Sequence, residues 1–159
     1  MSSAIAVELP DEIRAARDGL VAFLRSEVLP LRERHPHLFQ DPRGYYDESG
    51  RVSADVRAIL RDVRMASAKA GFYQMCVPET LGGGGLGHLA YYVCWEALSH
   101  LTGPQHDAAH SVIAHWCFGP SRLLERVTDR AREEILEPLM SGAKTMCFGL
   151  SEPGAGSDA

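Results

Sequence analysis

Apolar side chains recur at intervals of three and four residues along most of this chain, the spacing that gathers them on one face of an α-helix. The first such stripe follows Pro10 and should end near Pro36, because proline cannot donate the next helical hydrogen bond. The pattern predicts about six helices, at residues 11–35, 53–70, 88–101, 105–118, 121–127 and 129–136. An all-α fold is therefore expected.

Residues at the ends of these segments support the limits. Ser53 and Thr128 can each cap a helix, because their side-chain oxygens accept hydrogen bonds from amides that the first turn leaves free. Gly71 can end the second helix in the left-handed conformation, and Pro138 is expected to close the last one. Residues 35–50 are rich in turn formers and predict a long surface loop.

The third predicted helix carries several large apolar side chains. Leu89 and Val93 begin its expected apolar side, and Tyr92 and Trp95 widen it. Tyr91, Tyr92 and Trp95 could form a platform for a ligand, but aromatic residues at helical spacing more often belong to a core. We therefore predict a core role for them.

A change of pattern follows residue 142. Polar or small residues alternate with Met146, Phe148 and Leu150, which is the period of a strand. A lone strand leaves hydrogen-bonding groups unpaired on both edges, so we expect it to be the first strand of a β-domain encoded beyond this chain. The predicted division is a helical domain at residues 1–142 and the start of a β-domain at residues 143–159.

Composition excludes several classes of protein. The chain has 159 residues, 45% of them hydrophobic, which suits one domain with a buried core. Its formal charge is −5 and no stretch concentrates Lys and Arg, so no nucleic-acid partner is expected. Apolar runs are shorter than the ~20 residues that cross a bilayer, and the N-terminus is acidic. We predict no membrane partner and a cytoplasmic location.

No metal site is predicted. His106 and His110 are four residues apart, a spacing that can bind zinc on a helix, but the sequence offers no third ligand nearby. The four cysteines are widely spaced and are expected to be buried free thiols: Cys76, Cys94, Cys117 and Cys147.

Two segments stand out as candidates for ligand contact. The first is Val77-Pro78-Glu79 followed by the glycine-rich residues 82–87, which must form a loop packed closely against its surroundings. The second is Ser-Glu-Pro-Gly-Ala-Gly-Ser-Asp at residues 151–158. Neither is a dinucleotide or phosphate loop, because the strand–helix context and the lysine are missing. In this order, however, they resemble two signatures of the acyl-CoA dehydrogenase family, V-P-E-x-x-G-G-x-G-x-G and [TS]-E-P-x-A-G-S-D.

This resemblance implies the orthogonal multi-helix N-terminal domain of an FAD-dependent enzyme that dehydrogenates an acyl-CoA. The full-length enzyme would be a homodimer or homotetramer with an acyl-CoA substrate, and its catalytic base would lie beyond residue 159, so no catalytic residue is assigned here. Ser157 would also reach the thioester substrate. The residues expected to contact the flavin are Phe148, Gly149, Leu150, Ser151, Gly156 and Ser157.

Two alternatives remain open at this stage. One is a related flavin enzyme of the same fold, either an acyl-CoA oxidase or a flavin monooxygenase. The other is a non-catalytic helical binding module. The intact motif at residues 151–158 favours an enzyme, because a binding module has no physical need of it.

Overall fold

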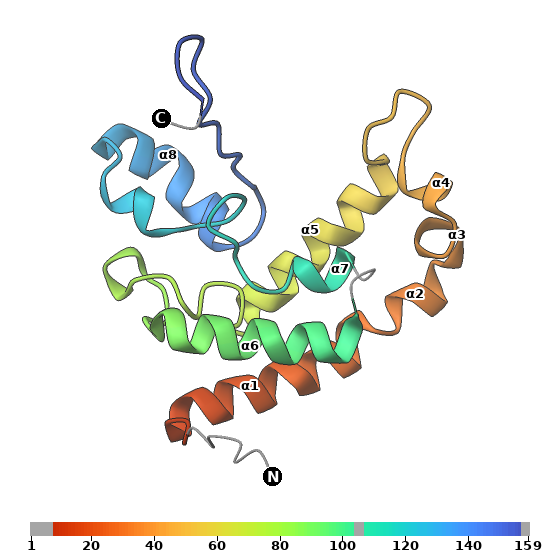
Figure 1. Ribbon diagram of the computed structural model, residues 1–159, viewed down its shortest axis with the longest axis horizontal. Coiled ribbons are helices and arrows are strands. Elements are labelled where there is room, and N and C mark those ends of the chain that lie inside the picture. Colours follow the sequence, from red (N-terminus) through yellow and green to blue (C-terminus); the bar gives the residue numbers. More distant parts are fainter. Residues whose placement is uncertain (1–7, 104–106, 157–159) are drawn as a thin grey trace.

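The computed structural model describes residues 8–103 and 107–156, and the described residues are helical with no strand, which confirms the all-α prediction. Figure 1 shows α1 and α6 side by side, with α5 rising from them and α8 near the C-terminal segment. The α-helices are α1 (Asp11–Phe23), α2 (Leu31–Arg34), α3 (Pro36–Phe39), α4 (Pro42–Tyr45), α5 (Ala54–Lys69), α6 (Gly87–Thr102), α7 (Asp107–His110) and α8 (Asp129–Met140).

The first predicted helix forms, but with a wider turn inside it. After α1 the chain continues as a π-helix at Leu24–Val28, in which the amide of Leu29 donates to the carbonyl oxygen of Leu24 at 2.9 Å. The wider turn keeps Leu24 and Val28 on the same buried face as Leu20. Pro30 then separates this segment from α2.

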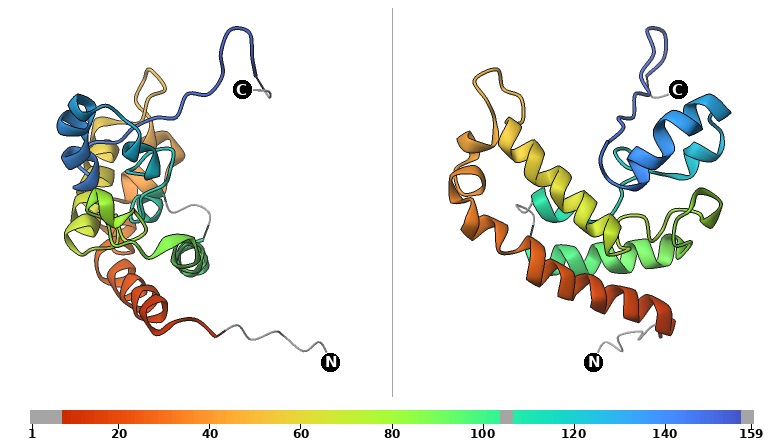
Figure 2. Two further views of the ribbon diagram at one scale, coloured as in Figure 1. Left: turned by 90° about the vertical axis from the view of Figure 1, so that its left-hand side faces the viewer. Right: turned by 180° about the vertical axis from the view of Figure 1, so that it is seen from behind.

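The face by which α6 packs on α1 differs from the predicted one. The fully buried residues of α6 are Ala90, Cys94 and Leu98, and the last two lie in the same core cluster as Leu24 of the π-helix. Leu89 is 51% exposed, so its expected core position is wrong. α1 and α6 lie side by side (Figure 2), and the small side chains of Ala90 and Cys94 on the buried face of α6 let the two helices approach closely.

The second predicted helix is confirmed as α5 with both of its end signals. The hydroxyl of Ser53 accepts a hydrogen bond from the amide of Val56 at 3.3 Å, and Gly71 has a φ of 88°. On the buried face of α5, the Ser67 hydroxyl donates to the carbonyl oxygen of Val112 at 2.6 Å. This bond joins α5 to the segment that follows α7.

Two further segments differ from the prediction, and in each the difference lies in the position of a proline relative to a helix. Residues 35–50 are not a plain loop, because Pro36 and Pro42 begin the short helices α3 and α4. Proline is favoured at the first helical position, where no amide donor is needed. Pro138 lies inside α8 and does not end it. Because proline has no amide hydrogen, the carbonyl of Glu134, four residues earlier, lacks its helical donor. Glu134 is exposed, so water can donate a hydrogen bond to that carbonyl.

The predicted helix at 105–118 is much shorter. Within the described residues it ends at His110, and turns follow. The amide of Ala114 donates to the carbonyl oxygen of Tyr73 at 2.9 Å, and Val112 accepts from Ser67. Tertiary partners thus take up backbone groups that a helix would have used. Residues 121–127 form a 3₁₀ turn, Arg122–Glu125, in place of a helix.

The glycine-rich loop packs on the chain before it, as expected. The amide of Gly84 donates to the carbonyl oxygen of Gln74 at 3.1 Å, and the amide of Leu86 donates to that of Met75 at 3.0 Å. A Cβ atom on Gly84 would lie 2.7 Å from the Met75 oxygen, which no real side chain tolerates. Glycine is therefore a steric requirement of this hairpin-like turn.

The predicted strand after residue 142 is not formed in the described part of the chain. The amides of Lys144 and Met146 donate to the carbonyl oxygens of Pro138 and Phe118 at 2.9 and 3.0 Å, and the segment then projects from the helical body (Figures 1 and 2). A strand requires a neighbour to pair with, and the described residues provide none. None of the described helices is long and apolar enough to span a bilayer.

Candidate functional site

A cavity of about 750 Å³ is lined by the start of α6 and by residues from three other parts of the chain, 73–78, 114–126 and 148. Its volume is that of a typical small-molecule site. Five aromatic residues contribute to its lining: Tyr73, Tyr91, Tyr92, Trp116 and Phe148. The first of the two sequence segments singled out above contributes Val77, Pro78 and Gly85 to the lining, and Phe148 lies three residues before the second.

The fold fixes Tyr73 at this cavity through its backbone. Its carbonyl accepts from Ala114, and its amide donates to the carbonyl oxygen of Ser67 at 3.4 Å. The residue is 3% exposed, and burial raises the pKa of its phenol although the nearby Arg64 acts in the opposite direction. Its hydroxyl makes no hydrogen bond with any described residue. Tyr73 is thus a buried residue whose neutral side chain lines the cavity.

Trp116 and Phe148 form the more open part of the wall. Their ring centroids are 5.0 Å apart and their planes meet at 68°, an edge-to-face contact. Trp116 is 50% exposed and Phe148 is 42% exposed. The hydrogen bond between Met146 and Phe118 holds this part of the C-terminal segment against the helical body.

Polar groups also line the cavity. Glu125 accepts a hydrogen bond from the Thr80 hydroxyl at 2.6 Å and lies 3.6 Å from the guanidinium of Arg122. The hydroxyl oxygen of Ser121 is buried and has no hydrogen-bond partner among the described residues. Ser121 and Tyr73 therefore place two unpaired hydroxyl groups at one cavity.

Cys76 lines the cavity without being a nucleophile. Burial is the main cause that raises the pKa of its thiol to about 12, and proximity to Cys94 adds to it. Because the thiolate is the reactive form, this cysteine stays protonated and inert near neutral pH. Cys94 is buried as predicted, Cys76 and Cys117 are half-buried, and Cys147 is exposed, so burial was not a correct prediction for all four.

The structure separates the residues that were predicted to contact flavin. Phe148 lines the cavity. Gly149, Leu150, Ser151 and Gly156 are exposed in the projecting segment, where Glu152 and Ala155 close a tight turn (Figure 1). Ser157 lies outside the described residues. The flavin contacts of these residues remain a prediction.

The extended segment nevertheless fits the edge of a flavin ring. The backbone amides and carbonyls of residues 148–151 make no hydrogen bonds with other described residues. A Cβ placed on Gly149 would meet no atom within 4 Å, so one side of this segment is open to a ligand. Free, exposed backbone donors of this kind can pair with the polar edge of a flavin ring.

The histidines near α7 lie against an aromatic side chain. The rings of His110 and His115 lie 5.6 and 6.4 Å from that of Trp95, and Nδ1 of His115 accepts a hydrogen bond from the amide of Cys117 at 3.2 Å. Burial lowers the pKa of His115. His106 lies outside the described residues. Within the part of the chain that the structure describes, no three His, Cys, Asp or Glu side chains are grouped as metal ligands would be.

The core role predicted for the aromatic stripe is wrong for Tyr92, whereas Tyr91 and Trp95 are partly buried against the main core cluster. Tyr92 is 68% exposed, and both Tyr91 and Tyr92 line the cavity. The sequence held a signal for this. The small residues Ala90 and Cys94 mark the face of α6 that approaches α1, so Tyr92 had to face elsewhere.

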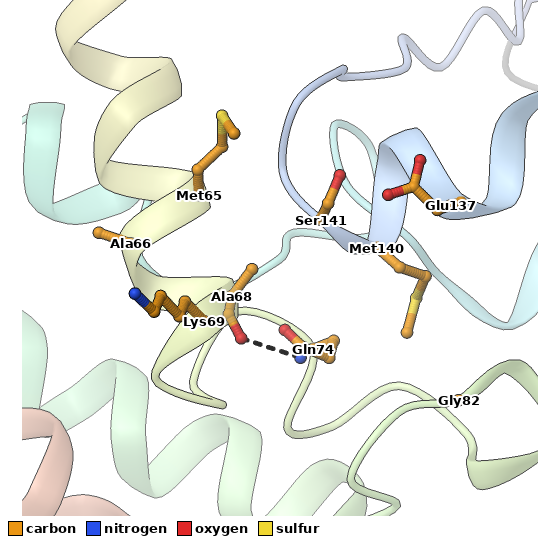
Figure 3. A pocket seen from close by; sticks show the side chains of 9 residues that line it. All are labelled: Met65, Ala66, Ala68, Lys69, Gln74, Gly82, Glu137, Met140 and Ser141. Atoms are coloured by element: carbon orange, nitrogen blue, oxygen red, sulfur yellow. Dashed lines mark hydrogen bonds between the residues drawn. The ribbon is translucent and has the colours of Figure 1, made fainter.

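A second hollow, of about 590 Å³, lies between the end of α5 and the end of α8. Figure 3 shows Lys69 and Ala68 on one side and Met140 on the other, with Gln74 below them. The Gln74 amide nitrogen donates to the carbonyl oxygen of Ala68 at 3.1 Å. Gly82 of the glycine-rich segment lines this hollow, but none of the residues predicted to contact the flavin does, so the aromatic cavity is the better candidate site.

The described part of the chain is thus a helical domain with an aromatic cavity beside an exposed backbone segment. The family model described as "Acyl-CoA dehydrogenase, N-terminal domain" matches residues 10–143, so the chain belongs to this family. No solved structure gave a significant match.

Curated relatives agree with this family. The chain is 36% identical over 92 residues to "Caffeyl-CoA reductase-Etf complex subunit CarC" of Acetobacterium woodii, covering 58% of this chain and 24% of that protein. It is 33% identical over 104 residues to a "3-(aryl)acrylate reductase" of Clostridium sporogenes, covering 62% and 26%. The chain is also 30% identical over 156 residues to a short-chain specific acyl-CoA dehydrogenase of Bos taurus, and the match covers 96% of this chain and 32% of that protein. The chain spans a quarter to a third of the length of these relatives.

Proposed function

We propose that the protein carrying this chain is an FAD-dependent oxidoreductase that dehydrogenates an acyl-CoA between its α and β carbons. The chain supplies the N-terminal helical domain. The observation that carries the proposal is the continuity from the cavity wall at Phe148 into the motif at residues 151–158. One ligand site and one cofactor-contacting segment are thereby joined by a few residues of backbone.

Each part of the chain has a proposed role. Backbone donors at residues 148–151 and the Ser151 hydroxyl would hold the polar edge of the flavin ring. FAD bound there supplies hydride acceptance from the β-carbon. Gly156 and Ser157 would close the turn beside it, with Ser157 contacting the thioester. The base that removes the α-proton is expected in another part of the protein, so no described residue is proposed as catalytic.

The names of two relatives favour a second candidate, the same chemistry in the opposite direction. The proteins of Acetobacterium woodii and Clostridium sporogenes are named as reductases of caffeyl-CoA and of 3-(aryl)acrylate. An acyl-CoA dehydrogenase site and an enoyl-CoA reductase site differ in which electron carrier meets the flavin. Both candidates require the flavin contacts described above.

The test is to express this chain together with whatever its genome encodes in frame on either side of it. We expect a yellow protein whose flavin absorption bleaches when an acyl-CoA is added without oxygen. In a matched pair, Ser151→Ala should weaken flavin retention and Thr145→Ala should not. Hydrogen peroxide formation in air would instead identify an oxidase. A colourless protein that gains no flavin on reconstitution would overturn the proposal and favour a binding module.

Three further properties of the whole protein belong to this proposal. We expect a homodimer or homotetramer, an acyl-CoA as the small-molecule partner and a cytoplasmic location. Light scattering on the purified protein measures the first, and fractionation of the native cells measures the last. A monomer that binds flavin fully would contradict the expected assembly.

A further inference from the structure

We infer that the aromatic cavity holds a hydroxylated aromatic ring, so that the thioester substrate is a hydroxyaryl acyl-CoA. The identity of the thioester rests on the proposed function, whereas the ring site rests on the cavity alone. No motif identified in the sequence specifies this ligand.

The shape and lining of the cavity favour a flat ring. Tyr91 and Tyr92 have ring centroids 5.6 Å apart at an interplanar angle of 84°, and Trp116 meets Phe148 edge to face. Tyr73 adds a fifth aromatic side chain. Faces and edges of aromatic side chains attract the complementary edges and faces of a bound ring, a gain that an alkyl chain cannot obtain. The volume of about 750 Å³ accommodates a phenylpropenoyl group.

The two unpaired hydroxyl groups specify a polar substituent on that ring. Both hydroxyl groups belong to residues that line the cavity, and the Ser121 oxygen is buried without a hydrogen-bond partner among the described residues. A buried hydroxyl without a partner is unfavourable, and a ligand hydroxyl can both donate and accept. Tyr73 remains a donor near neutral pH because burial raises the pKa of its phenol. An unsubstituted ring would leave both groups unpaired.

The experiment measures binding by calorimetry with three probes: 4-hydroxycinnamoyl-CoA, cinnamoyl-CoA and hexanoyl-CoA. We expect the hydroxylated probe to bind roughly tenfold more tightly than cinnamoyl-CoA, the effect of a buried hydrogen bond, and hexanoyl-CoA to bind most weakly. Tyr73→Phe and Ser121→Ala should reduce the preference for the hydroxyl while leaving the affinity for cinnamoyl-CoA unchanged. Tyr46→Phe, at an exposed tyrosine outside the cavity, is the matched control and should change nothing.

Each outcome supports or overturns the inference. Equal affinity for the two aromatic probes, or tightest binding of hexanoyl-CoA, overturns it, even if the protein is a flavin dehydrogenase for aliphatic substrates. The comparison of probes on the unmodified protein decides the question if a variant fails to fold. A hydroxyl preference in a protein without flavin would support the ring site and overturn the proposed function instead.

Discussion

At the scale of single residues, side chains of the same type occupy different environments in and around the cavity. Four cysteines were indistinguishable by their spacing, yet one lies exposed in the C-terminal segment and one lines the cavity with a strongly raised pKa. Similarly, Tyr91 and Tyr92 are neighbours in a helix but differ in exposure. Such differences arise from contacts between distant segments, which no local pattern reports.

Cysteine reactivity provides a direct check. We expect iodoacetamide at pH 8 to modify Cys147 first, because it is exposed, and to leave Cys76 unmodified in the folded protein. Raising the pKa of Cys76 to about 12 lowers its thiolate fraction at pH 8 by several orders of magnitude. Mass spectrometry of digests taken over time measures the order of labelling. Labelling of Cys76 as fast as Cys147 would contradict the buried position, and both should react equally in denaturant.

At the scale of elements, helices were predictable wherever a stripe of apolar residues carried its own end signals. α5 formed between Ser53 and Gly71 because the cap and the stop act within a few residues. The segment after α7 was not predictable, since Ser67 and Tyr73 take its backbone partners from other parts of the chain. Phe148, which the family resemblance predicted as a flavin contact, lines the candidate cavity, whereas no motif includes Tyr73 or Ser121.

The turn between α5 and α6 gives a prediction at this scale. Gly84→Ala should lower the free energy of unfolding by about 1–3 kcal/mol, because its Cβ would press on the carbonyl oxygen of Met75. Gly149→Ala is the control, since its Cβ would meet open space, and it should change the stability by less than about 0.5 kcal/mol. Denaturant unfolding followed by circular dichroism measures both. Equal stability of the two variants would show that the turn yields without cost.

At the scale of the whole molecule, two separate apolar clusters stabilise the fold. The larger one joins α1, the π-helix, α6 and α7, and the smaller one joins the 3₁₀ turn Arg122–Glu125 to α8. Met146 is the last residue along the chain that packs against either cluster. The part of the chain after it contributes exposed backbone, which suits a role in binding better than one in folding.

Shortening the chain tests this division. A chain that ends at Gly149 should have the same free energy of unfolding as the 159-residue chain within about 0.5 kcal/mol, because residues 150–156 bury little of their surface. A chain that ends at Ala143 loses Met146 from the smaller cluster and should be less stable by about 1–3 kcal/mol. Thermal and denaturant unfolding compare the three. Strong destabilisation on ending at Gly149 would assign the projecting segment a structural role.

The contact between Trp116 and Phe148 has an optical consequence. The chain has two tryptophans, and one of them stands half exposed at the cavity. Indole emission shifts with the polarity of its surroundings, so replacing Trp95 by Phe would leave Trp116 as the single tryptophan of the chain, which can be excited selectively over tyrosine. The colour of its emission would then report, without any added label, whether the cavity contains water or a ligand.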